Sequence, residues 1–124
     1  ILDDDALHFR SLKGFETLAK LGAELHITAT TIAEIVVGLH RKFNQRAKAL
    51  IFLEKAIGEW TKLVPVDQDL LGMAHEILAK SQSKKNTIFD AINVAAVKKH
   101  QLDRIFSFDR WYEKQGVGNS DKFT

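Results

Sequence analysis

Hydrophobic residues recur at three- and four-residue spacing in five stretches of the chain, which is the periodicity of a helix with one buried face. The first stretch ends at Gly22, and Asn44 separates the second from the third. Asp67 and Thr87 are residue types that cap the start of a helix, and they open the last two stretches. The pattern predicts helices over residues 6–21, 45–57, 68–80 and 88–99, with one more turn at 110–114. The second helix is expected to begin at Thr30 or Thr31 and to end before Asn44.

Short runs of apolar and β-branched residues separate these helices. Leu25–Thr28, Leu63–Val66 and Arg104–Phe108 are predicted as strands, and Pro65 places the second one at a sheet edge or a strand end. Because short strands alternate with much longer helices, we predict a parallel sheet covered by helices. The expected fold class is α/β, a three-layer α/β/α arrangement in a single domain over residues 1–124.

Composition narrows the possible classes of protein. The chain has 124 residues, 45% of them hydrophobic and 27% charged, with one proline, which excludes a disordered or proline-rich chain. It has no cysteine, so disulfide frameworks, thiolate zinc sites and cysteine nucleophiles are excluded, and a reducing cytoplasmic location is expected. No apolar run reaches the ~20 residues that a membrane-spanning helix needs. The net charge of +2 permits a polyanionic partner without requiring one.

Three acidic residues fall where the predicted strands lead into helices. Glu34 is expected in the first turn of the helix after the first strand, Asp90 in the first turn of its own helix, and Asp109 just after the last strand. In a parallel sheet such junctions share the carboxyl edge, where ligand sites form. Carboxylate oxygens without cysteine or paired histidines suit a hard cation such as Mg²⁺ or Mn²⁺.

The same acids have a second interpretation as helix caps. Thr31 with Glu34, and Thr87 with Asp90, both have the spacing of a capping box, in which the acid accepts a hydrogen bond from a backbone N–H at the helix start. Asp109 could likewise cap the final helical turn. The residues alone therefore leave a metal site and a set of caps both open.

Three segments together resemble the acidic motifs of the PIN-domain family, which includes the VapC toxins of prokaryotic toxin–antitoxin pairs. The segments are Ile32–Ile35, Thr87–Ala95 and Ile105–Asp109. The resemblance implies that Glu34, Asp90 and Asp109 bind Mg²⁺ or Mn²⁺ as the catalytic acids of an endoribonuclease that hydrolyses RNA phosphodiester bonds. It also implies that the Ser107 hydroxyl supports the last acid or binds water.

The family opens with a strand that ends in the first metal-binding Asp. Asp3 is the candidate within the chain, yet Glu34 follows it by only 31 positions, which is short for the family. Residues 2–8 look more like the loop after that strand. We therefore expect the first strand and its Asp to be missing at the amino-terminal end of the chain.

Other residues are candidates for contacts with RNA or a partner. Arg41, Lys42 and Arg46 form a basic stretch suited to phosphate contacts, although a solvated helix face is the more ordinary explanation. Trp111 and Tyr112 could stack on a base, but such a pair more often closes a core. The apolar helix pair from residue 32 to 57 resembles a PIN-domain dimer surface, with core packing as the alternative.

Together these features predict the ribonuclease toxin of a toxin–antitoxin pair. It would be an Mg²⁺- or Mn²⁺-dependent hydrolase that acts on RNA, forms a homodimer and is held inactive by a cognate antitoxin protein. The alternative is a PIN-like module that binds RNA or a partner protein without cleaving. A response-regulator-like domain also clusters acids at a sheet edge, but the segment Ile105–Asp109 lacks the lysine that it would need.

Overall fold

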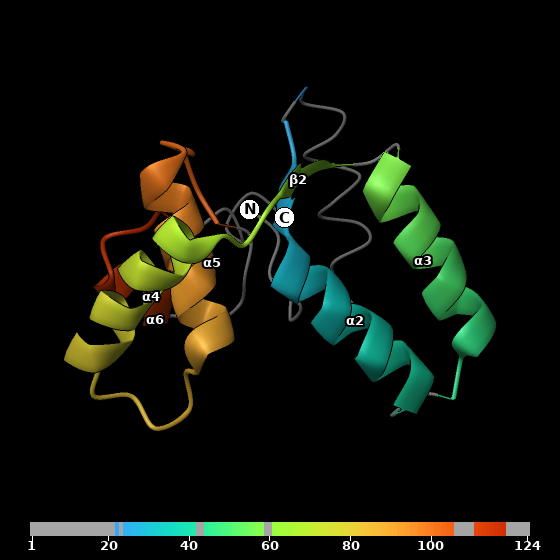
Figure 1. Cartoon of the computed structure of the whole chain (residues 1–124), viewed down its shortest axis with the longest axis horizontal. Helices are drawn as coiled ribbons and strands as arrows, with labels where there is room; N and C mark the ends of the chain where they lie inside the picture. Colours follow the sequence, from blue (N-terminus) through green and yellow to red (C-terminus); the bar gives the residue numbers. More distant parts are fainter. Residues whose placement is uncertain (1–21, 23, 42–43, 59–60, 106–110, 119–124) are drawn as a thin grey trace.

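The computed structural model describes residues 22, 24–41, 44–58, 61–105 and 111–118. Strands β1 (His26–Thr28) and β2 (Lys62–Val64) pair in parallel, in the register Ile27 to Leu63. Figure 1 shows α2 and α3 on one side of these strands and α4, α5 and α6 on the other, which confirms the predicted α/β fold class. The helices are α2 (Ala29–Arg41), α3 (Arg46–Gly58), α4 (Gln68–Lys80), α5 (Ile88–Lys99) and α6 (Trp111–Lys114).

Most element boundaries agree with the sequence pattern. Strand β2 ends one residue before Pro65, whose missing N–H cannot continue a strand ladder. Asn44, between α2 and α3, has a φ of 49°, a left-handed conformation that asparagine tolerates better than most residues. The predicted helix over residues 6–21 and the predicted strand beyond Ile105 lie outside the described residues, as does Asp3. No helix in the described part of the chain is long and apolar enough to cross a membrane.

Helix α2 begins earlier than the sequence pattern predicts. It follows β1 without a loop and starts at Ala29, because the Thr28 hydroxyl accepts the backbone N–H of Thr31 at 3.2 Å, as a capping side chain does. Thr31 therefore lies inside the helix, and Glu34 falls in its second turn. The predictions that Glu34 lies in the first turn and that Thr31 caps the helix were wrong.

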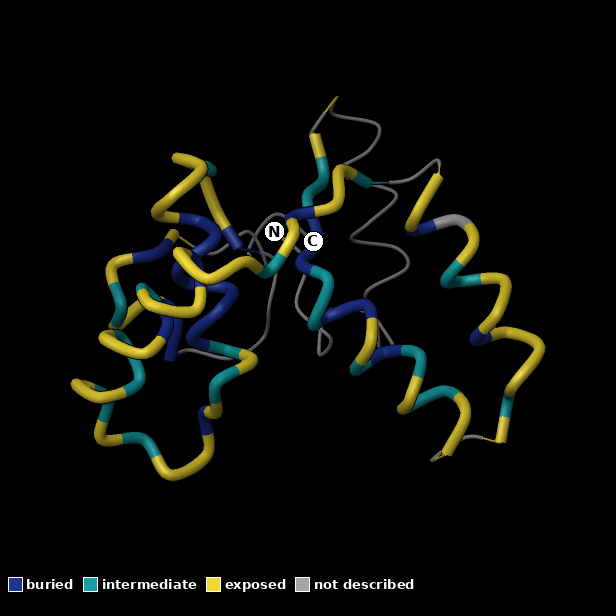
Figure 2. Tube along the Cα trace, in the orientation of Figure 1, coloured by how far each residue is buried: buried dark blue, intermediate teal, exposed yellow. Residues whose placement is uncertain are grey.

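The core consists of two hydrophobic clusters. In one, α5 is buried on all sides from Ala91 to Val97 and packs against Leu70 and Ala74 of α4. The other lies among β1, α2 and α3 and contains Ile27, Ile32, Ile35 and Ala56. In Figure 2 the buried stretch of α5 is continuous, whereas most of α3 is exposed. Helix α5 is thus the central element of the core, and a capping box fixes its first turn.

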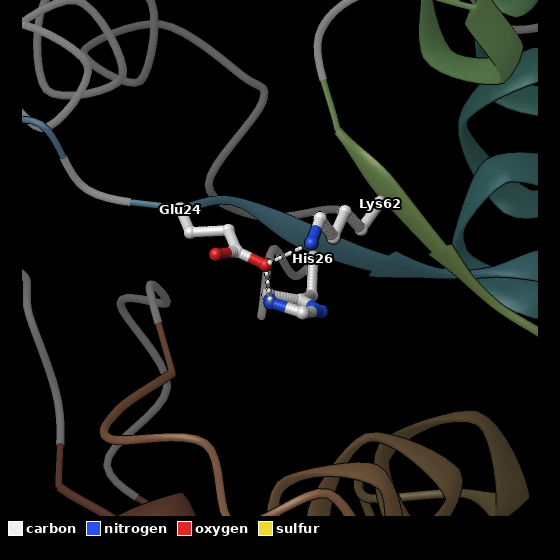
Figure 3. Close-up of polar contacts among 3 residues, drawn as sticks. All are labelled: Glu24, His26 and Lys62. Atoms are coloured by element: carbon white, nitrogen blue, oxygen red, sulfur yellow. Dashed lines mark ion pairs between the residues drawn. The ribbon is translucent and has the colours of Figure 1, made fainter.

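A charged cluster lies at the amino ends of the two strands (Figure 3). The Glu24 carboxylate is 2.8 Å from the Lys62 ammonium and 3.2 Å from His26 Nε2. The hydrogen bond and charge of Lys62 hold the pKa of Glu24 below its ordinary value. Burial lowers the pKa of His26, an effect that outweighs the nearby Glu24 charge. Because His26 and Lys62 are register partners, the cluster supports the strand pairing, at the sheet end opposite the predicted acidic site.

Candidate functional site

A buried polar network connects β1 and α2 to α5. The hydroxyls of Thr28 and Thr31 both donate to Asn93 Oδ1, at 3.0 and 3.2 Å. All three side chains are at most 1% exposed. A carbonyl oxygen has two lone pairs, so one amide satisfies both hydroxyls and its own orientation is fixed. This contact sets how the start of α2 meets the second turn of α5.

The network continues from Asn93 to an acid. Asn93 Nδ2 donates to the Tyr112 hydroxyl at 3.4 Å, and that hydroxyl donates to Asp90 Oδ1 at 3.0 Å. Tyr112 is fully buried, and Asp90 is half-buried. A buried hydrogen-bond chain in which every group has a partner is rigid. The orientation of the Asp90 carboxylate is therefore fixed from the core outward.

Asp90 also caps the helix that carries it. Its Oδ2 accepts the backbone N–H of Thr87 at 3.0 Å and Asn86 Nδ2 at 3.3 Å, and the Thr87 side chain completes a capping box. The capping interpretation is thus confirmed for Asp90. A carboxylate offers about four lone-pair positions, and these described contacts use three of them. Capping therefore does not prevent Asp90 from binding a ligand.

Glu34 and Asp90 lie on the two helices that this network joins. Residues three apart share one face of a helix, so Glu34 is one turn from Thr31 along α2 and Asp90 is one turn from Asn93 along α5. The hydrogen bond between Thr31 and Asn93 therefore joins the two helices one turn away from each of the predicted acids. Glu34 is half-buried. The predicted residues Asp109 and Ser107 lie outside the described part of the chain.

The chemistry of these side chains fits a hard divalent cation. Glu34 and Asp90 offer only carboxylate oxygens, the ligands that Mg²⁺ and Mn²⁺ prefer. The hydrogen bonds from Tyr112 and Asn86 resemble the supporting contacts that orient metal ligands. Within the described residues no three acidic or histidine side chains come together, so Glu34 and Asp90 would need a further ligand.

Comparison with known proteins identifies the family. The PIN domain family matches residues 1–116. The chain belongs to the PIN domain family. Its fold is similar to that of VapC20 from Mycobacterium tuberculosis, a sarcin–ricin loop cleaving toxin, with a TM-score of 0.78 and 15% sequence identity over 94% of each chain. None of the curated proteins matches. The predicted resemblance to a VapC-like PIN domain is thereby confirmed for family and fold.

The predicted basic residues of this PIN domain lie at the turn between α2 and α3. Arg41 and Arg46 are exposed there, and Figure 1 places this turn at the far end of α2 from β1. Arg41 is seven positions after Glu34 along α2, a rise of about 10 Å. Lys42 lies outside the described residues. Contact of these cations with RNA stays a prediction, and the structure does not bring them to the acids.

Trp111 and Tyr112 close the core of the PIN domain, as the more ordinary interpretation predicted. They are 7% and 0% exposed, and their rings meet edge to face at 5.4 Å. Trp111 Nε1 donates to Ser81 Oγ at 3.2 Å. Burial leaves neither ring face open for stacking on a base. The hydroxyl of Tyr112, rather than its ring, is what reaches the candidate site.

Asn93 and Asn86 are parts of the candidate site that were not predicted from the sequence. A signal for Asn93 is present, because it stands alone among seven residues that are otherwise apolar, Ala91 to Val97. A polar side chain in a helix that is buried all round needs hydrogen-bond partners. For Asn86 the only signal in the sequence is its position directly before Thr87, the residue that caps α5.

Proposed function

We propose that this PIN domain is a metal-dependent endoribonuclease and the toxin of a toxin–antitoxin pair. The proposal rests chiefly on one observation, the fixed orientation of Asp90, one turn along α5 from the hydrogen bonds that join α5 to the helix of Glu34. The family resemblance gives both acids a place in the metal site. VapC20, which shares the fold, is a toxin that cleaves the sarcin–ricin loop, and this supports RNA as the substrate class.

In the proposed mechanism Glu34, Asp90 and Asp109 would hold Mg²⁺ or Mn²⁺. A bound ion would supply Lewis-acid chemistry, namely polarisation of a phosphate oxygen and activation of water. Tyr112 and Asn86 keep the Asp90 carboxylate in one orientation, so that binding requires little rearrangement. One of the carboxylates orients the attacking water, and Ser107 supports Asp109 or binds water. No serine, cysteine or histidine nucleophile is required.

The test is Mn²⁺-dependent RNA cleavage by the wild type and by Asp90→Asn. Asparagine keeps one acceptor oxygen, so the variant should stay folded with a modest loss of stability, while cleavage should fall at least 100-fold. Asp67→Asn is a matched control, because Asp67 also caps a helix, accepting the Leu70 N–H at 2.9 Å on α4. The control should retain cleavage.

The outcomes separate the interpretations of Asp90. If Asp90→Asn cleaves as well as the wild type, Asp90 is only a cap and the proposed site is wrong. If the wild type binds RNA but cleaves none with either metal, the chain is a non-cleaving PIN-like module. Circular dichroism of each protein shows whether lost cleavage merely reports unfolding.

We further propose that the outer surface of α2 and α3 forms the homodimer, and that a cognate antitoxin holds the toxin inactive. The inner faces of these helices are buried, as core packing requires. Four other apolar residues of α2 and α3 remain 48–63% exposed. Large apolar side chains that stay exposed on two neighbouring helices favour an interface. This outer α2–α3 surface consists of Val37, Leu50, Ile51 and Ile57.

A further inference from the structure

A polar pocket lies beside the candidate site and is lined by residues from the end of α4, from the loop that joins α4 to α5, and from helix α6 and the residue after it. Figure 1 shows where these elements lie in the fold. Its volume is about 560 Å³. Pockets of about 300–1,000 Å³ accommodate ligands of small-molecule size. A nucleotide falls in that class.

The pocket is positively charged. Lys80 at the end of α4, Lys85 in the loop and Lys114 at the end of α6 all line it. The other lining residues are serines, amides and the edge of Trp111, and none of the described residues that line it carries a negative charge. This lining, which we call the lysine pocket, therefore suits an anion.

One wall of the lysine pocket contacts the catalytic acid proposed above. Asn86 lines the pocket and is 7% exposed, and its Nδ2 donates to Asp90 Oδ2 at 3.3 Å. The Ser83 hydroxyl, also in the lining, donates to Asn86 Oδ1 at 2.6 Å and fixes the amide. The Asn86 side chain thus connects the lining of the lysine pocket to the Asp90 carboxylate.

We propose that the lysine pocket binds a phosphate and its nucleoside from the RNA strand, next to the phosphodiester that is cut. This inference rests on the proposed ribonuclease function. The Lys80 and Lys114 ammonium groups contact the phosphate, and the serine and amide groups offer hydrogen bonds to phosphate and sugar oxygens. Such contacts position a strand without reading its sequence.

The lining favours RNA over an acidic segment of a partner protein. Protein partners usually insert aromatic or aliphatic anchors into desolvated apolar pockets. Here the one large apolar side chain in the lining, Trp111, is 7% exposed and is already engaged with Ser81. Polar groups and cations around a nucleotide-sized space instead match a sugar–phosphate chain.

The experiment measures RNA binding without cleavage. A short fluorescent single-stranded RNA is titrated with the full chain in EDTA, over a series of salt concentrations. The test variant is Lys80→Ala/Lys114→Ala, and the matched control is Lys84→Ala/Lys98→Ala, which removes the same charge from exposed lysines outside the lining. Lys84 is a stringent choice because it adjoins Lys85 in sequence.

The test variant should bind RNA about 10- to 30-fold more weakly at 0.1 M salt, with a salt slope smaller by about 1.4, because each phosphate contact to a single strand contributes about 0.7. The control variant should change affinity by less than about threefold. Lys80→Arg/Lys114→Arg should restore most of the binding. An equal loss in the test and control variants would overturn the proposal, since the effect would then be one of general charge.

Two further measurements distinguish the occupant and the function. If the test variant loses binding to poly-glutamate but keeps its affinity for RNA, the pocket receives an acidic protein segment and the proposal is wrong. The second measurement is cleavage in the presence of Mn²⁺. If the wild type cleaves RNA and the test variant has the same KM, the proposal that the pocket binds RNA is wrong, but the proposed ribonuclease function is not affected. Lysine-dependent RNA binding by a wild type that never cleaves would support the pocket and reject the ribonuclease.

Discussion

The hydroxyl of Tyr112 is the link between the buried core and the candidate acid, and Tyr112→Phe removes that link. The ring stays and fills the same space, so no cavity forms. Among the contacts of the described residues, one donated bond to Asp90 Oδ1 and one accepted bond from Asn93 Nδ2 are lost. The double-mutant cycle below isolates the contact with Asp90.

The expected cost follows from where the two partners lie. A hydrogen bond to a charged group contributes about 1.5–3 kcal/mol, but half-exposed Asp90 recovers part of this from water. Asn93 is 1% exposed, and a buried donor left without its acceptor costs about 1–3 kcal/mol. We expect Tyr112→Phe to lower the free energy of unfolding by about 2–3 kcal/mol.

Urea unfolding of a double-mutant cycle with Asp90→Asn isolates the bond between the two side chains. Asp90→Asn should cost about 1–2 kcal/mol less in the Tyr112→Phe background than in the wild type, because the shared contact is already gone. A loss below about 0.5 kcal/mol for Tyr112→Phe, with no coupling in the cycle, would refute the conclusion that Tyr112 fixes Asp90.

The same variant has a consequence for metal binding that a purely structural role would not produce. Loss of a contact that orients a ligand weakens metal affinity about 10–100-fold. The rise in melting temperature with Mn²⁺ should therefore be smaller for Tyr112→Phe. Thr61→Val is the control: it also removes one hydroxyl, which donates to the Ala56 carbonyl at 3.1 Å, remote from Asp90. It should lose stability without losing Mn²⁺ affinity.

Two other predictions concern the surface and the sheet. Ile51→Glu on the outer α2–α3 surface should convert the proposed dimer to a monomer by light scattering, whereas Leu71→Glu, at a comparably exposed apolar position on α4, should not; an unchanged mass for Ile51→Glu would reject that interface. Burial holds the pKa of His26 below its ordinary value of 6.5, so the unfolded chain takes up the proton first and the free energy of unfolding falls as the pH drops below about 6.5. His26→Gln should flatten this fall between pH 7 and 5 in urea unfolding, and an equally steep fall in the variant would show that other groups cause it.

The features that the sequence predicts well depend on neighbours only a few positions away. The caps at Asp67 and Thr87 form as expected, since a cap needs only the backbone of the next turn. Pro65 ends β2 for an equally local reason. The PIN-domain motifs also predict the family. They do so only in combination, because a single acid with apolar flanks, such as Glu34 or Asp90, is not specific to it.

The start of α2 could not be predicted in this way. Thr28, Thr30 and Thr31 are all good capping residues, so the local sequence allows several helix starts. The structure selects Thr28, whose hydroxyl both accepts from the Thr31 N–H and donates to Asn93, 65 positions away. A contact over that distance in sequence leaves no periodic signal, and the position of Glu34 within its helix depends on it.

The contact between the helices of the two candidate acids also cannot be predicted from the sequence. Asn93, as the one polar residue in a buried helical run, shows that some partner must exist, but not which one. Its carbonyl oxygen receives the threonines that begin α2, and its amide nitrogen reaches Asp90 through Tyr112. Because the same Asn93 side chain contacts both the start of α2 and Tyr112, a shift of α2 relative to α5 would disturb the Asp90 carboxylate as well as Glu34. The buried amide of Asn93 therefore links the helices that carry the two acids, and we expect its loss to affect both of them.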